Sequence, residues 1–400
     1  MLRVVNRYGV ISQSLMRNIC KRRFSVLDIL KGDTYMLEHE LYMKLALENA
    51  KAMKGQTTPN PLVGSVIVND NRIVGVGAHM KAGEPHAEIH AIRMAGEQAR
   101  GATIYVTLEP CSHHGRTGPC AEAIVQAGIK KVVVATLDPN PLVSGRGIKI
   151  LQDAGIEVLV GVCEEESKKM NEVFNKYILT KRPFVTIKSG VTLDGKIATS
   201  SSDSKWITST EARQEVHQIR NENAAILVGA NTVQKDNPSL TTRIPNGRNP
   251  IRIILDSTLR IPMEANVVTD GEAPTWIFTT SNHAAKKKKA LENAGVKVFV
   301  TSGEKHINLH EMLDVLGQKG VSSLLIEGGG EVNASFIENK LMDKLILYVA
   351  PKIIGGRLAP SFVGGTGITK MQDAIEFKDI SFTQVGKDYR FIGYPEYRNI

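Results

Sequence analysis

The sequence predicts an α/β protein with two domains, and three observations support this prediction. The chain has 400 residues, more than a single hydrophobic core usually serves. Helical and strand patterns alternate along most of it, and the alternation is interrupted once, at "TKRPF" (180–184), before it restarts. The content of 42% apolar and 23% charged residues is typical of a soluble globular protein.

The first half should form one sheet covered by helices on both faces. A helix is expected over 36–53, ahead of Gly55, and a hairpin follows with its turn at "NDN" (69–71), because Asn and Asp favour such turns. After the hairpin, helices are expected at 86–99, 120–128, 147–155 and about 164–179, and strands at 103–108, 131–136 and 156–160.

The second half repeats this alternation with a different set of strands. The domain boundary is therefore placed near residue 180, which gives domains of 36–180 and 181–400. The expected strands are at 184–191, 224–230, 251–256, 275–280, 296–300, 323–329 and 344–353. The longest apolar runs are strand-sized, well short of the ~20 residues that a membrane-spanning helix requires. No membrane span is expected.

Residues 1–35 form a basic leader with seven Lys or Arg and two Asp. The Arg-rich composition resembles a mitochondrial transit peptide. We favour the simpler interpretation that Met36 is the true start, since "KGD" ahead of it could be encoded as a ribosome-binding site. On either interpretation, the leader should be poorly ordered and dispensable.

Charge and cysteine content narrow the partners and the compartment. Over half of the formal net charge of +9 comes from the leader, so the folded part offers no basic stripe and a nucleic-acid partner is not expected. Four cysteines are too few for a secreted disulfide framework in a chain of this length. A reducing cytoplasm is the expected location.

A His-x-Glu motif and two Pro-Cys pairs predict a catalytic zinc site. His86, Cys111 and Cys120 can supply the three protein ligands that leave a fourth position open for water. Glu88 could carry the proton of that water to a leaving amine. Pro119 is suited to the first turn of the helix that starts near Cys120. H-x-E followed by Pro-Cys is the zinc deaminase signature, although eight residues separate these two cysteines instead of two.

Two other interpretations of these residues remain open. Cys111 and Cys120 could form a disulfide, which a reducing compartment disfavours. A closed structural zinc site could recruit a fourth ligand, from among His90, His113 and His114. Glu88 discriminates between the catalytic and structural alternatives, because a structural site has no use for it.

A glycine cluster in the second half suggests a binding site for an anionic cofactor. "SLLIEGGGEVNASFIENKL" (323–341) reads as strand, three glycines and helix. Backbone without side chains can approach a ligand closely, and the helix N-terminus favours a pyrophosphate. The pattern is not G-x-G-x-x-G, so a simple tight turn is an equally good interpretation of the glycines alone.

Longer segments resemble one known family. "TTPNPLVGSVIV", "HAEIHA", "VTLEPCSHHGRTGPC" and "DPNPLVSGRGI" closely resemble the bifunctional riboflavin-biosynthesis deaminase–reductases of bacteria, as do "FVTIKSGVTLDGKIA", "SKWITS" and "AILVGANTVQKDNPSLTTR". The resemblance extends over 36–400. It implies a cytidine-deaminase-like three-layer domain followed by a dihydrofolate-reductase-like α/β domain. It also implies zinc-dependent deamination of a diaminopyrimidinone ribosylamino 5′-phosphate, and then reduction of the ribosyl group to ribityl by NADPH.

For the deaminase half, the resemblance assigns site residues one by one. His86, Cys111 and Cys120 match metal ligands, and Glu88 matches the proton carrier. Five further residues match positions that line the ring and phosphate pocket: Asn60, His79, Arg116, Asp138 and Asn140. Ordinary turn chemistry is the alternative explanation for these five. Many family members carry Lys where this chain has Arg116.

For the reductase half, Lys188 and Asp236 match a polar pair at the reacting centre, where a cation and a proton donor can offset the charge that hydride addition builds. Cofactor contacts are implied at Gly190, Trp206, Thr232, Asp236, Ser257, Gly329, Gly330, Glu331, Val332, Asn333, Ala334 and Ser335. Substrate contacts are implied at Ser204, Arg220, Leu240 and Glu327. The alternatives are a surface lysine for Lys188 and core packing for Trp206.

Two other function classes compete with this one. A deaminase of free or polynucleotide bases with a degenerate second domain is disfavoured, because Lys188, Asp236 and the glycines are all present. A non-enzymatic zinc-stabilised binding protein is disfavoured by Glu88. We therefore expect a hydrolase and oxidoreductase in one chain, acting on a small phosphorylated pyrimidine, with Zn²⁺ and NADPH as cofactors and a homo-oligomeric assembly.

Overall fold

The computed structural model describes residues 26–112, 118–141 and 143–397, with side chains from residue 36. The chain divides into two compact units. The first comprises the described residues up to Ala52, together with Val63–His79 and Pro85–Lys168, and the second comprises Met53–Leu62, Met80–Glu84 and the chain from Lys169 onward. The division after Lys168 lies upstream of the expected boundary near residue 180.

A mixed five-stranded sheet forms the centre of the first unit. Its strand order is β2-β1-β3-β4-β5, with β1, β2 and β3 antiparallel and β3, β4 and β5 parallel. The strands are β1 (Gly64–Asn69), β2 (Arg72–Ala78), β3 (Thr103–Val106), β4 (Lys131–Val134) and β5 (Glu157–Val160). Asp70 and Asn71 have positive φ at the turn between β1 and β2, as the residue types in "NDN" predict.

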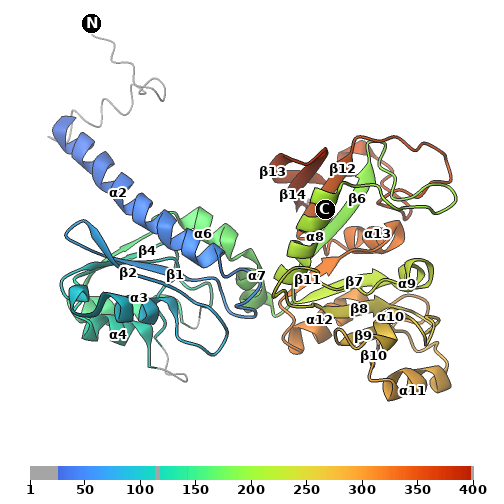
Figure 1. Cartoon of the computed structure of the whole chain (residues 1–400), viewed down its shortest axis with the longest axis horizontal. Helices are drawn as coiled ribbons and strands as arrows, with labels where there is room; N and C mark the ends of the chain where they lie inside the picture. Colours follow the sequence, from blue (N-terminus) through green and yellow to red (C-terminus); the bar gives the residue numbers. More distant parts are fainter. Residues whose placement is uncertain (1–25, 113–117, 142, 398–400) are drawn as a thin grey trace, which may run out of the picture. The chain divides into compact units, whose positions relative to one another are not determined.

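Helices cover both faces of this sheet, which makes the unit three-layered (Figure 1). One face carries α2 (Val26–Lys51) and α6 (Glu164–Met170), and the other carries α3 (Ala87–Ala95), α4 (Cys120–Gln126) and α5 (Arg146–Asp153), with η1 (Gly96–Ala99) after α3. Gly64 and Gly77 let the helices approach closely, since a Cβ would lie 1.9 Å from the Ala46 carbonyl oxygen and 2.1 Å from that of Ala87, respectively.

The first helix begins earlier than the sequence predicts. Helix α2 starts at Val26, upstream of the expected start at Met36, although its described buried side chains begin at His39. The predicted lack of order in residues 1–35 is therefore wrong for residues 26–35, which are helical, and its remainder, residues 1–25, lies outside the described residues. The predicted helix over 164–179 is two helices, α6 and α7 (Glu172–Thr180), and α7 belongs to the second unit.

A nine-stranded sheet forms the second unit. Its order is β10-β9-β8-β7-β11-β6-β12-β14-β13, parallel from β10 to β12 and antiparallel beyond. The strands are β6 (Phe184–Thr192), β7 (Ala225–Gly229), β8 (Ile251–Leu255), β9 (Thr275–Thr279), β10 (Lys297–Val300), β11 (Ser323–Ile326), β12 (Lys344–Ala350), β13 (Glu376–Val385) and β14 (Asp388–Glu396). The seven strands predicted from 184 to 353 are confirmed.

Two apolar clusters bury the faces of this larger sheet. One includes side chains of α12 (Leu309–Gln318) and α13 (Gly330–Glu338), and the other includes side chains of α9 (Ala230–Asp236), α10 (Asn266–Thr269) and α11 (Ala285–Asn293). Helix α8 (Thr210–Glu222) packs beside β12, and η2 (Met371–Asp373) precedes β13. In the described part of the chain, every helix is too short or too polar to span a lipid bilayer.

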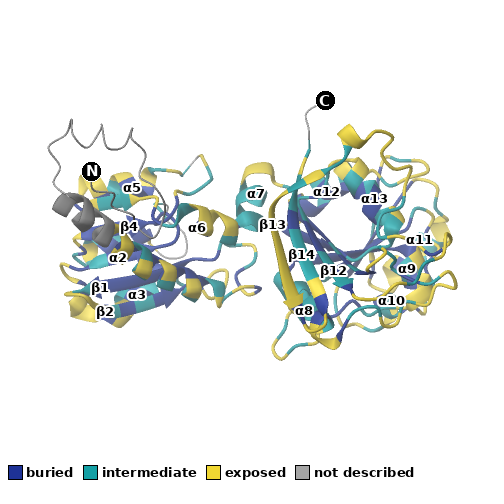
Figure 2. Ribbon diagram, turned by 90° about the horizontal axis from the view of Figure 1, so that it is seen from above, coloured by how far each residue is buried: buried dark blue, intermediate teal, exposed yellow. Residues whose placement is uncertain are grey.

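The C-terminal hairpin of β13 and β14 is absent from the sequence prediction. Its signal is nonetheless present, because "EFKDISFTQV" and "DYRFIGYPE" flank Gly386, which has a positive φ. Strand β13 lies at the edge of the sheet and is exposed along most of its length (Figure 2). It presents Ile380 and Phe382 to solvent.

Candidate active sites

The three predicted zinc ligands lie together in the first unit. His86 immediately precedes α3, Cys120 is the first residue of α4, and Cys111 lies in the loop after β3. His86 Nδ1 is 3.5 Å from Cys111 Sγ and 3.3 Å from Cys120 Sγ, and all three ligand atoms are within 4.8 Å of one another. Both cysteines are free thiols, so no disulfide joins them.

Hydrogen bonds at the two cysteines stabilise a thiolate on Cys111. The Cys120 backbone N–H donates to Cys111 Sγ over 3.3 Å. A hydrogen bond from the Cys120 thiol lowers the pKa of Cys111 to about 4, while the same bond and burial raise the pKa of Cys120. One imidazole and two sulfurs, one of them a ready thiolate, match the donor set that Zn²⁺ prefers. The residues present therefore fit a zinc ion.

Glu88 lies in the first turn of α3, two residues from His86, and is only 2% exposed. Burial raises its pKa to about 7. Its Oε2 atom has no hydrogen-bond partner among the described residues, which leaves a buried oxygen available for a bound molecule. Within the described ranges, the metal cluster contains no fourth His, Cys, Asp or Glu. Of the three alternative fourth ligands, His90 is not part of the cluster, and His113 and His114 lie outside the described residues. The buried Glu88 beside the ligands favours an open catalytic site over a closed structural one.

The other predicted deaminase contacts have different positions. His79 is buried with its ring edge-on to that of His86, at a centroid distance of 5.3 Å. The Asp138 carboxylate accepts the backbone N–H of Asn140 over 2.8 Å, so both residues form one turn after β4. Asn60 belongs to the segment that groups with the second unit. Arg116 lies outside the described residues.

In the second unit, a cavity of about 1020 Å³ opens at the carboxyl ends of β6, β7, β8 and β11. This is where open parallel sheets commonly bind ligands. Of the predicted contacts, it is lined by Lys188, Gly190, Ser204, Trp206, Arg220, Thr232, Asp236, Leu240, Glu327, Gly329, Gly330, Glu331 and Val332. The structure does not place Ser257, Asn333, Ala334 or Ser335 on the lining.

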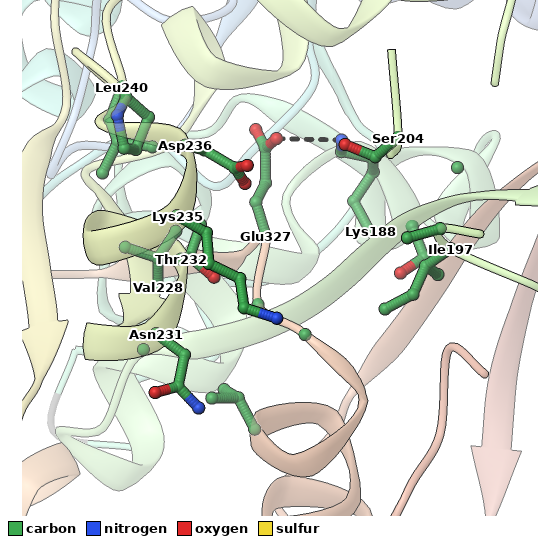
Figure 3. A pocket seen from close by; sticks show the side chains of 18 of the residues that line it. Lys188, Ile197, Ser204, Val228, Asn231, Thr232, Lys235, Asp236, Leu240 and Glu327 are labelled. Atoms are coloured by element: carbon green, nitrogen blue, oxygen red, sulfur yellow. Dashed lines mark ion pairs between the residues drawn. The ribbon is translucent and has the colours of Figure 1, made fainter. Parts of the chain in front are cut away.

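A buried carboxylate, Glu327, lies on the lining of this cavity and pairs with Lys188 (Figure 3), and Arg220 is its second cationic partner. Lys188 Nζ is 2.9 Å from Glu327 Oε2, and the Arg220 guanidinium donates to both Glu327 oxygens, over 2.8 and 3.0 Å. Burial alone would raise the pKa of Glu327, but Arg220 and Lys188 outweigh it and hold that pKa well below its usual range. Lys188 is therefore not a surface lysine.

Asp236 and Trp206 lie on the cavity wall with more exposure. Asp236 is the last residue of α9, and its carboxylate points toward the centre of the cavity (Figure 3). Lys188, its predicted partner, pairs instead with Glu327. Trp206 is 63% exposed and its ring lies 4.5 Å from the Arg213 guanidinium, which excludes core packing as its role.

The cavity carries more positive than negative side chains. Its lining includes the acids Asp236, Glu327 and Glu331 and the cations Lys188, Lys205, Arg213, Arg220, Lys235, Arg243 and Arg260. This excess, together with its volume, fits a dinucleotide with several phosphates and a second phosphorylated ligand. The sequence analysis did not identify two lining residues, Arg243 and His217. His217 lies one turn before Arg220 in α8, and burial and Arg220 lower its pKa.

The three glycines at the start of α13, Gly328, Gly329 and Gly330, have separate structural roles. A Cβ on Gly328 would lie 2.7 Å from the Val332 side chain, and one on Gly330 would lie 2.5 Å from the Ser361 carbonyl oxygen. Only the space next to Gly329 is open, and this residue precedes the first turn of α13 on the cavity wall. Close packing thus explains two glycines, and Gly329 is the one that leaves room for a ligand.

Comparisons with known proteins match each half of the chain to a known domain family. Residues 36–136 match the cytidine and deoxycytidylate deaminase zinc-binding region, and residues 183–391 match the RibD C-terminal domain. The chain is 48% identical over 358 residues to the riboflavin biosynthesis protein RibD of Bacillus amyloliquefaciens, covering 89% of this chain and 96% of that protein. It is 40% identical over 366 residues to RibD of Escherichia coli K12, covering 88% and 98%.

Solved structures give the same result. Acinetobacter baumannii RibD superposes with a TM-score of 0.81 at 39% identity, covering 90% of this chain and 99% of that one. The Thermotoga maritima diaminohydroxyphosphoribosylaminopyrimidine deaminase/5-amino-6-(5-phosphoribosylamino)uracil reductase gives 0.78 at 37% identity, covering 90% and 100%. These matches confirm the predicted fold class, a cytidine-deaminase-like domain followed by an α/β reductase domain.

Proposed function

This chain belongs to the RibD family of riboflavin biosynthesis proteins, and we propose that it catalyses two successive steps of that pathway in two separate units. The first is zinc-dependent hydrolytic deamination of the diaminopyrimidinone ribosylamino 5′-phosphate. The second is NADPH-dependent reduction of the ribosyl group to ribityl. One observation carries the proposal: each unit has its own constellation, His86–Cys111–Cys120 beside buried Glu88 in one and Lys188–Glu327–Arg220 in the other.

In the deamination, His86, Cys111 and Cys120 would hold Zn²⁺, and the chemistry that this ion would supply is a water made acidic near neutral pH. Glu88 accepts a proton from that water and returns it to the departing amine, so water adds to the ring and ammonia leaves. Its buried, unpartnered oxygen and its pKa of about 7 suit a group that must both accept and donate a proton near neutrality. His79, Asp138 and Asn140 contact the substrate, with Asn60 and Arg116 completing the predicted contacts.

In the reduction, the large cavity would hold NADPH against the predicted contacts at Trp206, Thr232 and Gly329, and the chemistry that this cofactor would supply is a hydride. Lys188 offsets the negative charge that develops on the substrate oxygen when the ribose ring opens. Glu327 holds Lys188 and Arg220 in place, and Arg220, Ser204 and Leu240 position the sugar phosphate. Asp236 provides a polar group for proton transfer at the reacting centre.

The substrate is a small molecule, and the cationic excess of the reductase cavity lies in a concave site, which suits phosphates of small ligands better than a polynucleotide. The low cysteine content favours the cytoplasm. The exposed edge strand β13 supports a homo-oligomer, because a second copy would cover its unpaired backbone and the exposed Phe382.

One assay tests the function directly. The purified protein is incubated with the diaminopyrimidinone ribosylamino phosphate while ammonia release and NADPH absorbance are followed together. We expect ammonia to appear first and NADPH to be consumed only after it. Deamination of cytidine or of a cytosine-containing oligonucleotide at a comparable rate would favour the base-deaminase alternative instead.

A further inference from the structure

Glu109 connects the zinc-ligand segment to the substrate loop of the first unit. It lies two residues before Cys111, directly after the strand β3 region, and is 6% exposed. Glu109 lies within the segment "VTLEPC", and it has no part in the proposed chemistry. A carboxylate this deeply buried requires partners, because an unpaired buried charge is costly.

Among the residues that the structure describes, the Glu109 carboxylate accepts hydrogen bonds from backbone N–H groups of one segment, residues 138–148. Glu109 Oε2 accepts from Asp138 over 3.2 Å and from Gly145 over 2.9 Å. Its Oε1 accepts from Gly147 over 2.9 Å and from Ile148 over 3.4 Å. The carboxylate therefore caps the first turn of α5, where Gly145 has no side chain that could do so. It also binds the start of the turn that follows β4.

The two segments also meet closely through their backbones. A Cβ on Gly147 would lie 2.0 Å from the Pro110 carbonyl oxygen, so only glycine permits this approach. On the other side, the Cys111 carbonyl accepts the Ala121 N–H over 3.2 Å, and Cys111 Sγ accepts that of Cys120. The short run from Glu109 to Cys111 thus contacts the start of α4 at one end and the start of α5 at the other.

We propose that Glu109 is a positioning residue for deamination: it sets where the turn bearing Asp138 and Asn140 stands relative to the metal ligands. Asn140 is held in this turn because its N–H bonds to Asp138, whose own N–H bonds to Glu109. The inference rests on the proposed function, in which this turn contacts the substrate. Glu109 itself touches neither the metal nor the reacting atoms.

The test is Glu109→Gln in the full-length protein, with kcat and KM measured for ammonia release. The amide of Gln keeps the size of the side chain. Its NH₂ group, however, cannot accept the hydrogen bonds that the backbone N–H groups donate to a carboxylate oxygen. We expect KM to rise by about tenfold or more, the loss typical of hydrogen bonds to a charged group, with a smaller change in kcat. Zinc should stay at about one ion per chain, and reduction of supplied deaminated intermediate should be unchanged.

Two comparisons distinguish positioning from general stabilisation. In a double-mutant cycle with Asn140→Ala, the Asn140 substitution should raise KM much less in the Glu109→Gln background than in the wild type, because the Asn140 side chain is already misplaced there. Effects that multiply independently would overturn the inference. Glu165→Gln, which changes a 91%-exposed carboxylate of the same unit, should leave both constants unchanged.

Other outcomes are equally decisive. Loss of zinc from Glu109→Gln would make the residue a support of the metal site and contradict the proposal. If that variant fails to fold, Glu109→Asp keeps the charge but shortens the reach, and it must raise KM with zinc retained. Wild-type kinetics in Glu109→Asp and Glu109→Gln would overturn the inference, whereas absence of ammonia release from the wild type would overturn the proposed function itself.

Discussion

Lys188 Nζ lies 2.9 Å from Glu327 Oε2 at the centre of the reductase cavity, and Arg220 pairs with the same carboxylate. Lys188 is part of β6, and Glu327 directly follows β11, its neighbour in the sheet. Their side chains are 12% and 10% exposed, so the pair is well shielded from screening by solvent. The ammonium therefore has a fixed position from which to act on a bound substrate.

Glu327→Gln should abolish most of the reductase activity while sparing deamination. The amide cannot hold Lys188 and Arg220 with the same charge, and removal of a single positioned electrostatic group commonly costs about 10²–10³ in kcat. Ammonia release from the same protein should remain at the wild-type rate, because its site belongs to the other unit. Unchanged NADPH oxidation would show that the Lys188–Glu327 pair has no part in reduction.

The same carboxylate should make the second unit sensitive to acid. Arg220 and Lys188 hold the pKa of Glu327 below the value of about 4.3 for an unfolded chain. Its stabilising contribution is therefore complete above that pH and is lost as the pH falls further below it. The difference in unfolding free energy between wild type and Glu327→Gln should shrink below about pH 4. Tryptophan fluorescence can follow this, since both tryptophans, Trp206 and Trp276, lie in the second unit.

Glu88→Gln should keep the metal and lose the chemistry. The three ligands are unchanged, so about one zinc per chain should remain by metal analysis. Without a group to carry the proton, ammonia release should fall by about 10²–10⁴. The matched control is Glu97→Gln, which changes an exposed carboxylate in η1, directly after α3, and should leave ammonia release unchanged. Full deaminase activity in Glu88→Gln would make the zinc structural.

The cluster of His86, Cys111 and Cys120 could be predicted because local sequence carries its constraints. His86 immediately precedes α3 and Cys120 is the first residue of α4, and a proline stands before each of them, so the sequence itself marks where the two helices begin. The role of Glu109 could not be predicted this way, since its partners lie beyond β4 and are backbone groups without a residue-type signal. The pairing of Lys188 with Glu327 likewise depends on which strands are neighbours, and local patterns do not specify strand order.

Arg252 shows a second limit of sequence patterns. In "IRIILD" it reads as the exposed position of an alternating strand, but its side chain is only 2% exposed. It pairs with Asp270 over 2.7 Å and donates to Thr275 Oγ1 over 2.9 Å and to the Ala273 carbonyl over 2.6 Å. These partners lie in the segment before β9 and at Thr275, the first residue of β9. The burial of Arg252 therefore could not be predicted from the sequence of β8, the strand that contains it.

Arg252→Met should therefore destabilise the second unit strongly. The substitution leaves Asp270 without its cation, and breaking a buried ion pair on one side typically costs about 3–5 kcal/mol. Denaturant unfolding followed by tryptophan fluorescence measures the change. The control is Lys288→Met, which removes an exposed i,i+4 pair with Glu292 on α11 and should cost less than about 0.5 kcal/mol. Equal effects of the two substitutions would contradict a structural role for the buried guanidinium.

The two active sites should fail independently of each other. Each unit has its own apolar core, and the residues of each proposed site are local to one unit, apart from Asn60. Asp236→Asn should stop NADPH oxidation while ammonia release from the starting pyrimidine continues, so that the deaminated, unreduced sugar phosphate accumulates. Mass spectrometry of the reaction mixture would identify this product.

The converse substitution, Cys111→Ser, removes one of three zinc ligands and should block deamination. Reduction of supplied deaminated intermediate should remain close to wild type, because the described residues that line the reductase cavity all belong to the second unit. Even if loss of the metal unfolds the first unit, because metal binding and folding are coupled in that unit, the second unit should stay folded. Tryptophan fluorescence, which reports only the second unit, should then stay native. Loss of both activities in Cys111→Ser with a native fluorescence spectrum would show that the reductase depends on the deaminase site, and the two-site assignment would be wrong in that respect.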